Sequence, residues 1–168
     1  MLREAAEHAD KVKVDMGLEY LNRFETYFLN CADDTRAMVK AVGHPRLSTM
    51  YDTFHANIEE KAIYKSIRDC GDVITHVHIS ENDRSTPGTG HVNWKDTFSA
   101  LKEIGYNRWM VIEAFGQALP DLAAATCIWR KMFPDEATLA QRGLQFIRDN
   151  YGSAPASNSS DRAAPAGK

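Results

Sequence analysis

The amino-acid sequence predicts an α/β fold with a parallel sheet, either a doubly wound sheet or part of a (β/α)8 barrel. Four short runs of strand-forming residues are each followed by a segment with apolar residues at three- and four-residue steps, which is the period of a helix. Alternating strands and helices of this kind give parallel strands joined by right-handed crossovers. No G-x-G-x-x-G or G-x-x-x-x-G-K-S/T motif follows a strand, so the nucleotide-binding form of the open sheet has no support.

The chain opens with a helical pattern at residues 2–12, and the predicted elements then alternate. Strands are predicted at residues 12–21, 47–52, 73–80 and 109–115. Helices are predicted at residues 33–42, 59–70, 94–104, 119–132 and 136–149, with Pro134 between the last two. Three of these helices precede a glycine, which commonly ends a helix with a positive φ: Gly43, Gly71 and Gly105.

Composition bounds the class of protein. The chain has 168 residues, 43% of them hydrophobic, which is enough for one domain with a real core. A net charge of −3 with acids and bases interspersed argues against a nucleic-acid surface or a polybasic membrane patch. No apolar run approaches the roughly 20 residues of a membrane span, and the N-terminus lacks the apolar core of a secretory signal. We therefore expect no nucleic-acid partner and no membrane insertion.

Two further features concern the ends and the cysteines. Residues 1–152 are predicted to form the domain, whereas residues 153–168 are rich in Ser, Ala and Pro without a bulky apolar side chain and are predicted to be a disordered tail. The three scattered cysteines are typical of reduced thiols, which favours a cytoplasmic protein: Cys31, Cys70 and Cys127.

The most informative feature is a polar side chain at the C-terminal end of every predicted strand. These four residues are Glu19, Asp52, His78 and Glu113. In parallel α/β folds functional groups gather at these strand ends. Three carboxylates brought together would repel one another unless a cation neutralised them. An oxygen-rich set with one nitrogen suits Mn²⁺, Mg²⁺ or Co²⁺.

Each of the four also has an ordinary structural interpretation. A single acid at a strand end is usually solvated or caps the next helix. His76, which shares a strand face with His78, is better explained as a hydrogen-bonded structural residue. Four coordinated placements are harder to explain in this way than one, so the sequence keeps both the metal site and the structural alternative open.

Four segments together resemble the ketose 3-epimerase family, also called the D-tagatose or D-allulose 3-epimerases. They are LEYLNRFETYFLN, YDTFHANIEE, HVHISENDRSTPGTGHVNW and VIEAFGQALP, and the likeness runs from about residue 13 to about residue 133. That family belongs to the xylose-isomerase-like TIM barrels. The resemblance therefore implies a partial (β/α)8 TIM barrel, corresponding to strands 5–8 with their helices, in the C-terminal half of the whole domain.

The same resemblance implies roles for individual residues. The metal, Mn²⁺ most often, would be held by the four strand-end residues named above, with Glu19 and Glu113 also acting as the catalytic acid–base pair. Three further residues match substrate-binding positions: Glu25, His55 and Arg84. Taken without the resemblance, Glu25 could pair with Arg23, His55 could cap the helix near Glu59, and Arg84 could be a loop charge.

The activity implied is the metal-dependent epimerisation of a free ketose at C3 through an enediolate. The alternatives are an aldose–ketose or hydroxypyruvate-type isomerase of the same superfamily, or a non-catalytic half-barrel that binds metal or docks a partner. A complete barrel has eight strands, and this sequence predicts four. We therefore expect the partners to be a ketose substrate and either a second copy of the chain or an N-terminal half-barrel.

Overall fold

Four parallel strands form the single sheet found in the described residues, 1–152, of the computed structural model; the predicted tail lies outside them. The strands are β1 (Met16–Glu19), β2 (Leu47–Asp52), β3 (Ile74–Ile79) and β4 (Trp109–Ile112). Their order across the sheet, β1-β2-β3-β4, is their order along the chain. A doubly wound sheet reverses its strand order at a switch point, so this order is that of a barrel segment.

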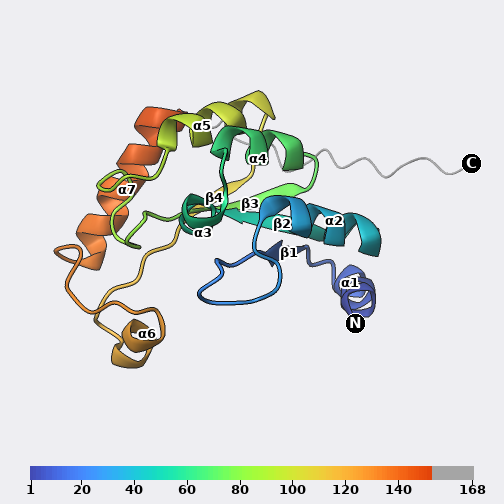
Figure 1. Cartoon of the computed structure of the whole chain (residues 1–168), viewed down its shortest axis with the longest axis horizontal. Coiled ribbons are helices and arrows are strands. Elements are labelled where there is room, and N and C mark those ends of the chain that lie inside the picture. Colours follow the sequence, from blue (N-terminus) through green and yellow to red (C-terminus); the bar gives the residue numbers. More distant parts are fainter. Residues whose placement is uncertain (153–168) are drawn as a thin grey trace, which may run out of the picture.

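The described residues contain seven helices, some of which cover one face of the sheet. They are α1 (Leu2–Lys11), α2 (Ala32–Val42), α3 (Thr53–Glu59), α4 (Ile63–Cys70), α5 (Trp94–Glu103), α6 (Pro120–Ala125) and α7 (Glu136–Tyr151). In Figure 1, α2, α4 and α5 lie along the same side of the sheet, α7 runs beside α5, and α6 stands apart at the lower left. Within the described residues, no helix combines the length and apolar character needed to cross a bilayer.

The core lies between the sheet and these helices. Tyr51, Val77 and Ile79 point away from the strand-end polar groups and are fully buried, where they join Ile67 of α4 and Leu101 of α5. Full burial of each aliphatic side chain contributes about 1.5–3 kcal/mol relative to exposure. These three strand side chains therefore line the helix side of β2 and β3.

The opposite face of the sheet is exposed to solvent on both outer strands. Gly17 on β1 and Trp109 and Val111 on β4 are exposed, Trp109 by 77% of its surface. β1 and β4 are also the outermost strands, and each pairs with one neighbour in the described chain. Half of a barrel would present both of these features, an uncovered inner face and two free strand edges.

Two predicted strand and helix boundaries at the start of the chain are wrong. The first strand was predicted at residues 12–21 but begins at Met16, because α1 continues to Lys11 and Lys13 then takes a positive φ of 59°. The helix predicted at residues 59–70 is instead two helices, α3 and α4. α3 starts directly after β2 because the side chain of Asp52 caps it, and Ala62 precedes α4 with a non-helical backbone.

Two predictions late in the chain also need correction. The helix predicted at residues 119–132 is only the short α6, which ends at Ala125 before Cys127 takes a positive φ of 59°. Gly43 and Gly105 have the positive φ values expected after a helix, 60° and 65°. Gly71 does not, with a φ of −57°; it lies so close to Ile104 that a Cβ atom would come within 2.7 Å of that side chain.

Candidate metal centre

Four strands bring four potential ligands to one point. Glu19 ends β1, Asp52 ends β2, His78 lies near the end of β3, and Glu113 directly follows β4. One ligand atom from each residue lies within 4.8 Å of all the others. The Nδ1 atom of His78 is central, at 3.7 Å from Glu19 Oε1, 3.3 Å from Asp52 Oδ2 and 3.2 Å from Glu113 Oε1. Parallel strands that end at the same edge explain this convergence.

The donor atoms of this cluster fit a divalent cation. Glu19 Oε1, Asp52 Oδ2 and His78 Nδ1 are buried, yet none has a hydrogen-bond partner among residues 1–152. His78 Nδ1 has a carboxylate oxygen within 3.7 Å on each of three residues but forms a hydrogen bond with none of them. Leaving a buried polar atom unsatisfied costs about 1–3 kcal/mol. A cation held by three carboxylates and one imidazole nitrogen would satisfy all of these atoms.

Asp52 combines the two roles that the sequence left open. Its Oδ1 accepts hydrogen bonds from the backbone N–H groups of Phe54, at 2.7 Å, and His55, at 3.0 Å, and so caps α3. Its Oδ2 faces the cluster, and the residue is fully buried. The helix cap therefore fixes the orientation of the carboxylate whose other oxygen belongs to the candidate site.

The electrostatics of the cluster shift the pKa values of its members. Burial, reinforced by the charges of Asp52 and Glu113, raises the pKa of Glu19 to about 7. Burial lowers the pKa of His78, but interactions with Asp52 and Glu113 outweigh it and raise that pKa to about 10. Burial raises the pKa of Glu113, yet its contact with His78 dominates and leaves the pKa below its usual value. Without a cation, a proton on His78 therefore offsets part of the carboxylate charge.

His55 is held beside the cluster by Asn22. Its Nδ1 lies 3.0 Å from the backbone N–H of Asn22, which donates to it, and 2.9 Å from the side-chain amide nitrogen of that residue. Because Nδ1 accepts, the proton of the neutral ring is on Nε2. Burial lowers the pKa of His55 and favours this neutral form. His55 lies inside α3 and does not cap a later helix, so that alternative is wrong.

Arg84 and Glu25 form an ion pair next to this histidine. A guanidinium nitrogen of Arg84 lies 3.1 Å from Glu25 Oε1, and the Arg84 side chain is only 6% exposed. The guanidinium carbon lies 4.0 Å from the ring centre of Phe54 and 4.9 Å from that of Phe115. The two alternatives from the sequence are wrong here, because Glu25 does not pair with Arg23 and Arg84 is not a free loop charge.

Sequence reasoning missed three residues that support these side chains. Asn22 joins His55 to Glu25, whose Oε1 accepts from the Asn22 amide at 3.0 Å. Phe54 and Phe115 enclose the Arg84 guanidinium. Asn22 lies within the quoted LEYLNRFE segment, and an asparagine just after a strand is a recognisable turn residue. Nothing in the local sequence pairs the two phenylalanines, because Phe54 lies on α3 and Phe115 in the segment after β4.

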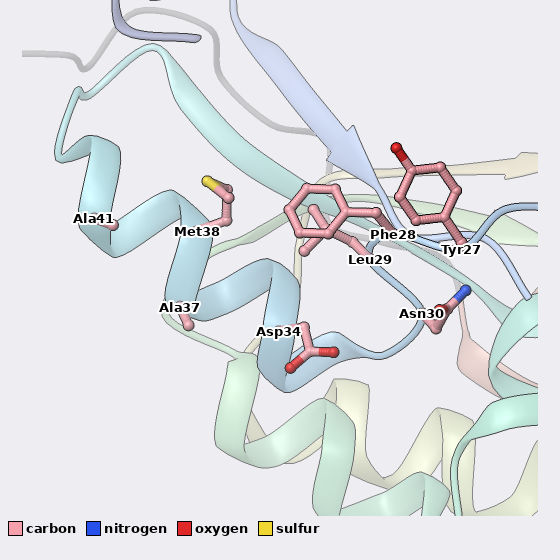
Figure 2. Close-up of a pocket in the computed structure, with 8 residues that line it drawn as sticks. All are labelled: Tyr27, Phe28, Leu29, Asn30, Asp34, Ala37, Met38 and Ala41. Carbon is pink, nitrogen blue, oxygen red and sulfur yellow. The ribbon is translucent and has the colours of Figure 1, made fainter. Parts of the chain in front are cut away.

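A cavity of about 440 Å³ lies elsewhere, between α2 and the loop before it. Figure 2 shows Phe28 and Leu29 on the loop side of this hollow and Met38 on the helix side. None of the seven site residues predicted from the sequence lines it. The cavity is therefore separate from the candidate metal centre.

Comparison with protein families and known proteins adds an independent observation. The family model described as xylose isomerase-like TIM barrel matches residues 1–150. The chain is 40% identical over 152 residues to a D-psicose 3-epimerase of Ruminiclostridium cellulolyticum, covering 88% of this chain and 52% of that protein. It is 36% identical over 146 residues to a probable ketose 3-epimerase of Synechocystis sp., covering 87% and 51% respectively.

Solved structures agree with this picture. A D-allulose 3-epimerase from Methylomonas sp., crystallised with D-allulose, superimposes with a TM-score of 0.85 at 34% sequence identity. The match covers 89% of this chain and 53% of that one. The chain thus spans about half the length of the curated relatives it matches.

Proposed function

Because the chain belongs to the xylose isomerase-like TIM-barrel family, we propose that it carries the metal centre of an enzyme that epimerises a free ketose at C3. The chain would correspond to the C-terminal half of that barrel. The single observation that supports this most strongly is the convergence of Glu19, Asp52, His78 and Glu113 within 4.8 Å. Relatives named as 3-epimerases of psicose and ribulose point to the same substrate class, a ketose of the fructose, allulose, tagatose or ribulose type.

The chemistry explains why two of the four residues are glutamates from the outer strands. Inverting C3 requires a proton to leave one face of the sugar and another to arrive on the opposite face. Glu19 belongs to the outer strand β1, and Glu113 follows the outer strand β4 at the other edge of the sheet. Asp52 and His78, from β2 and β3, lie between them. Each glutamate has a second carboxylate oxygen that could accept a proton from C3 of the sugar or return one to it. One base would therefore act on each face.

The C3–H bond is a weak acid, so the resulting enediolate needs strong electrostatic stabilisation. The bound metal would supply Lewis-acid polarisation of the ketose oxygens. Its ligand set of three carboxylates and one imidazole favours Mn²⁺, with Co²⁺ and Mg²⁺ as the other candidates. Arg84 adds a fixed positive charge next to this region, and Glu25 holds that charge in place. Neutral His55, whose Nε2 carries the proton, would donate a hydrogen bond to a sugar oxygen.

Solvent exchange tests the reaction class. With Mn²⁺ and a ketose in heavy water, the functional assembly that contains this chain should incorporate deuterium at C3. Glu113→Gln should abolish that exchange and leave sugar binding measurable, because the amide keeps the shape of the side chain but cannot carry the proton. Glu4→Gln is the matched control, since Glu4 lies on α1 with an 81% exposed side chain and should leave exchange unchanged.

Other labelling patterns would contradict the proposal. Deuterium at C1 with an aldose product would identify an aldose–ketose isomerase. Binding of Mn²⁺ without any exchange, even when the N-terminal half of a related epimerase is supplied, would identify a non-catalytic half-barrel.

A further inference from the structure

Glu81 is a buried carboxylate that the proposed reaction does not use. It is fully shielded from solvent and forms no ion pair within residues 1–152. Both oxygens instead accept hydrogen bonds from four N–H groups. Oε1 accepts from the backbone N–H groups of Asn82 and Val92, both at 3.1 Å, and Oε2 accepts from the Gly88 N–H at 2.8 Å and the Trp94 indole N–H at 3.0 Å.

These donors span the whole loop between β3 and α5. They begin next to Glu81, continue through the middle of the loop at Gly88, and end at Trp94, the first residue of α5. Charge-assisted hydrogen bonds are about twice as strong as neutral ones. One side chain therefore closes the loop onto the start of the next helix.

Two glycines allow the loop to approach this closely. Gly88 has a φ of +86°, and a Cβ atom there would come within 2.5 Å of the Phe146 ring on α7. A Cβ atom on Gly90 would lie 2.0 Å from Asn82 Oδ1 and 2.7 Å from Glu81 Oε1. The backbone thus packs directly against the carboxylate, with no space for a larger residue.

Arg84 is carried by the same loop and is fixed at both backbone groups. Its N–H donates to the Glu81 carbonyl oxygen at 2.9 Å, and its own carbonyl accepts from the Phe115 N–H at 2.9 Å. Its φ of 56° is unusual for a residue with a side chain, so the surrounding loop must enforce it. This conformation delivers the guanidinium between the rings of Phe54 and Phe115.

We infer that Glu81 is a positioning residue: its carboxylate folds the loop of residues 81–93 so that Arg84 is held at the edge of the metal centre. The hydrogen-bond donors to Glu81 all belong to its own loop and to the start of α5, and none is a candidate metal ligand. Glu81 therefore acts on the site through Arg84. The part of this inference that concerns sugar binding rests on the proposed function. The part that concerns the position of Arg84 does not.

The first experiment measures the position of Arg84 without reference to activity. The sample is the isotope-labelled chain in complex with the N-terminal half of a related epimerase. In its nitrogen–proton spectrum the Arg84 Nε–H should show a ring-current shift from its two aromatic neighbours, and Arg84→Lys assigns this signal by removing it. Glu81→Gln replaces an acceptor oxygen with an NH₂ group that faces N–H donors. It should move that signal toward the values of exposed arginines and accelerate amide exchange at Gly88 and Val92 by about tenfold or more.

Glu60→Gln is the matched control, because Glu60 is a partly buried carboxylate that also accepts a hydrogen bond from a backbone N–H, that of Ala32 at 2.8 Å. It should leave the Arg84 signal in place. If Glu81→Gln does not fold, Gly90→Ala tests the same contact from the exposed side of the loop and should produce the same shift. An unmoved Arg84 signal in a folded Glu81→Gln or Gly90→Ala variant would overturn the inference.

The second experiment measures coupling in ketose turnover. Glu81→Gln should raise KM for the ketose by about tenfold while the dissociation constant for Mn²⁺ stays unchanged. In the Arg84→Lys background the same substitution should have little further effect, because both changes act on one interaction. Additive losses would show that Glu81 affects the site by another route. If the wild-type assembly turns over no ketose, the proposed function fails, and the Arg84 signal still decides the role of Glu81.

Discussion

At the scale of single residues, the candidate metal centre is a set of groups whose protonation depends on one another. Asp52 and Glu113 raise the pKa of His78 to about 10, and burial raises the pKa of Glu19 to about 7. A cation can bind Nδ1 of His78 only when that atom has lost its proton. Metal binding and proton release must therefore be linked.

The sign of this linkage gives a prediction. Between pH 7 and pH 8.5 the metal-free chain carries the His78 proton, so binding one Mn²⁺ should release about one proton and the affinity should rise about tenfold per pH unit. Below about pH 7, Glu19 is also protonated in the metal-free chain, and the number released should increase toward two. Calorimetric titrations in buffers with different ionisation enthalpies measure this number directly.

His78→Gln is the control for that titration. The glutamine offers a neutral oxygen near the same place and has no proton to lose, so the number of protons released at pH 8.5 should be lower than for the wild type, and the affinity should be weaker. Any release that remains comes from Glu19, whose pKa rises further when the His78 charge is removed. A wild-type affinity that does not change between pH 7 and pH 8.5 would contradict the ionisation state described for His78.

At the scale of elements, the junction between β2 and α3 joins stability to the site. Asp52 ends the strand, caps the helix with Oδ1 and turns Oδ2 toward the other ligands. The first turn of α3 then carries Phe54, which contacts Arg84, and His55. A sharp change from strand to helix is thus stabilised by the same carboxylate that the site uses.

Two substitutions at Asp52 should separate these roles. Asp52→Asn keeps an oxygen that can cap α3 but loses the charge, so Mn²⁺ affinity should fall by at least about tenfold with a small change in stability. Asp52→Ala also removes the cap, which should lower the free energy of unfolding by a further 1 kcal/mol or so, within a typical range of about 0.5–2 kcal/mol. Urea denaturation and metal titration of the two variants check this. Equal stability of the two variants would contradict the capping role.

At the scale of the whole molecule, the sheet presents surface that a complete barrel would bury. Both outer strands have one free edge in the described chain, and Trp109 and Val111 project from the uncovered face. Each Å² of apolar surface that stays exposed loses about 25 cal/mol of the stabilisation that burial would give. The free energy of unfolding of a whole domain is only about 5–15 kcal/mol. A partner that covered this face would recover that free energy.

We therefore expect the isolated chain to self-associate or to be loosely packed, with low ketose turnover. Adding the N-terminal half of a related epimerase should give a defined complex, restore turnover and shift the fluorescence of Trp109 to shorter wavelength. Trp109→Phe should remove that shift, whereas Trp129→Phe, at a similarly exposed position in the segment after α6, should not. A monodisperse monomer that unfolds cooperatively and epimerises ketoses alone would show that the four strands suffice.

The sequence by itself determined the class of the fold and the candidate ligands. Hydrophobic periods predicted four strands with intervening helices, and all four strands are present, because those periods are set by the local geometry of each element. Glu19, Asp52, His78 and Glu113 could be selected because parallel strands end at a common edge. That rule depends on connectivity alone.

Only the tertiary structure decided how the supporting residues act. The sequence did not show that Asp52 begins a new helix, that Asn22 orients His55, or that Glu81 organises the loop of Arg84. Each of these depends on hydrogen bonds between groups whose distance in space is not fixed by their separation along the chain. Local patterns report the period of an element, whereas the direction of a buried polar side chain is set by the partners that satisfy it after the elements have packed.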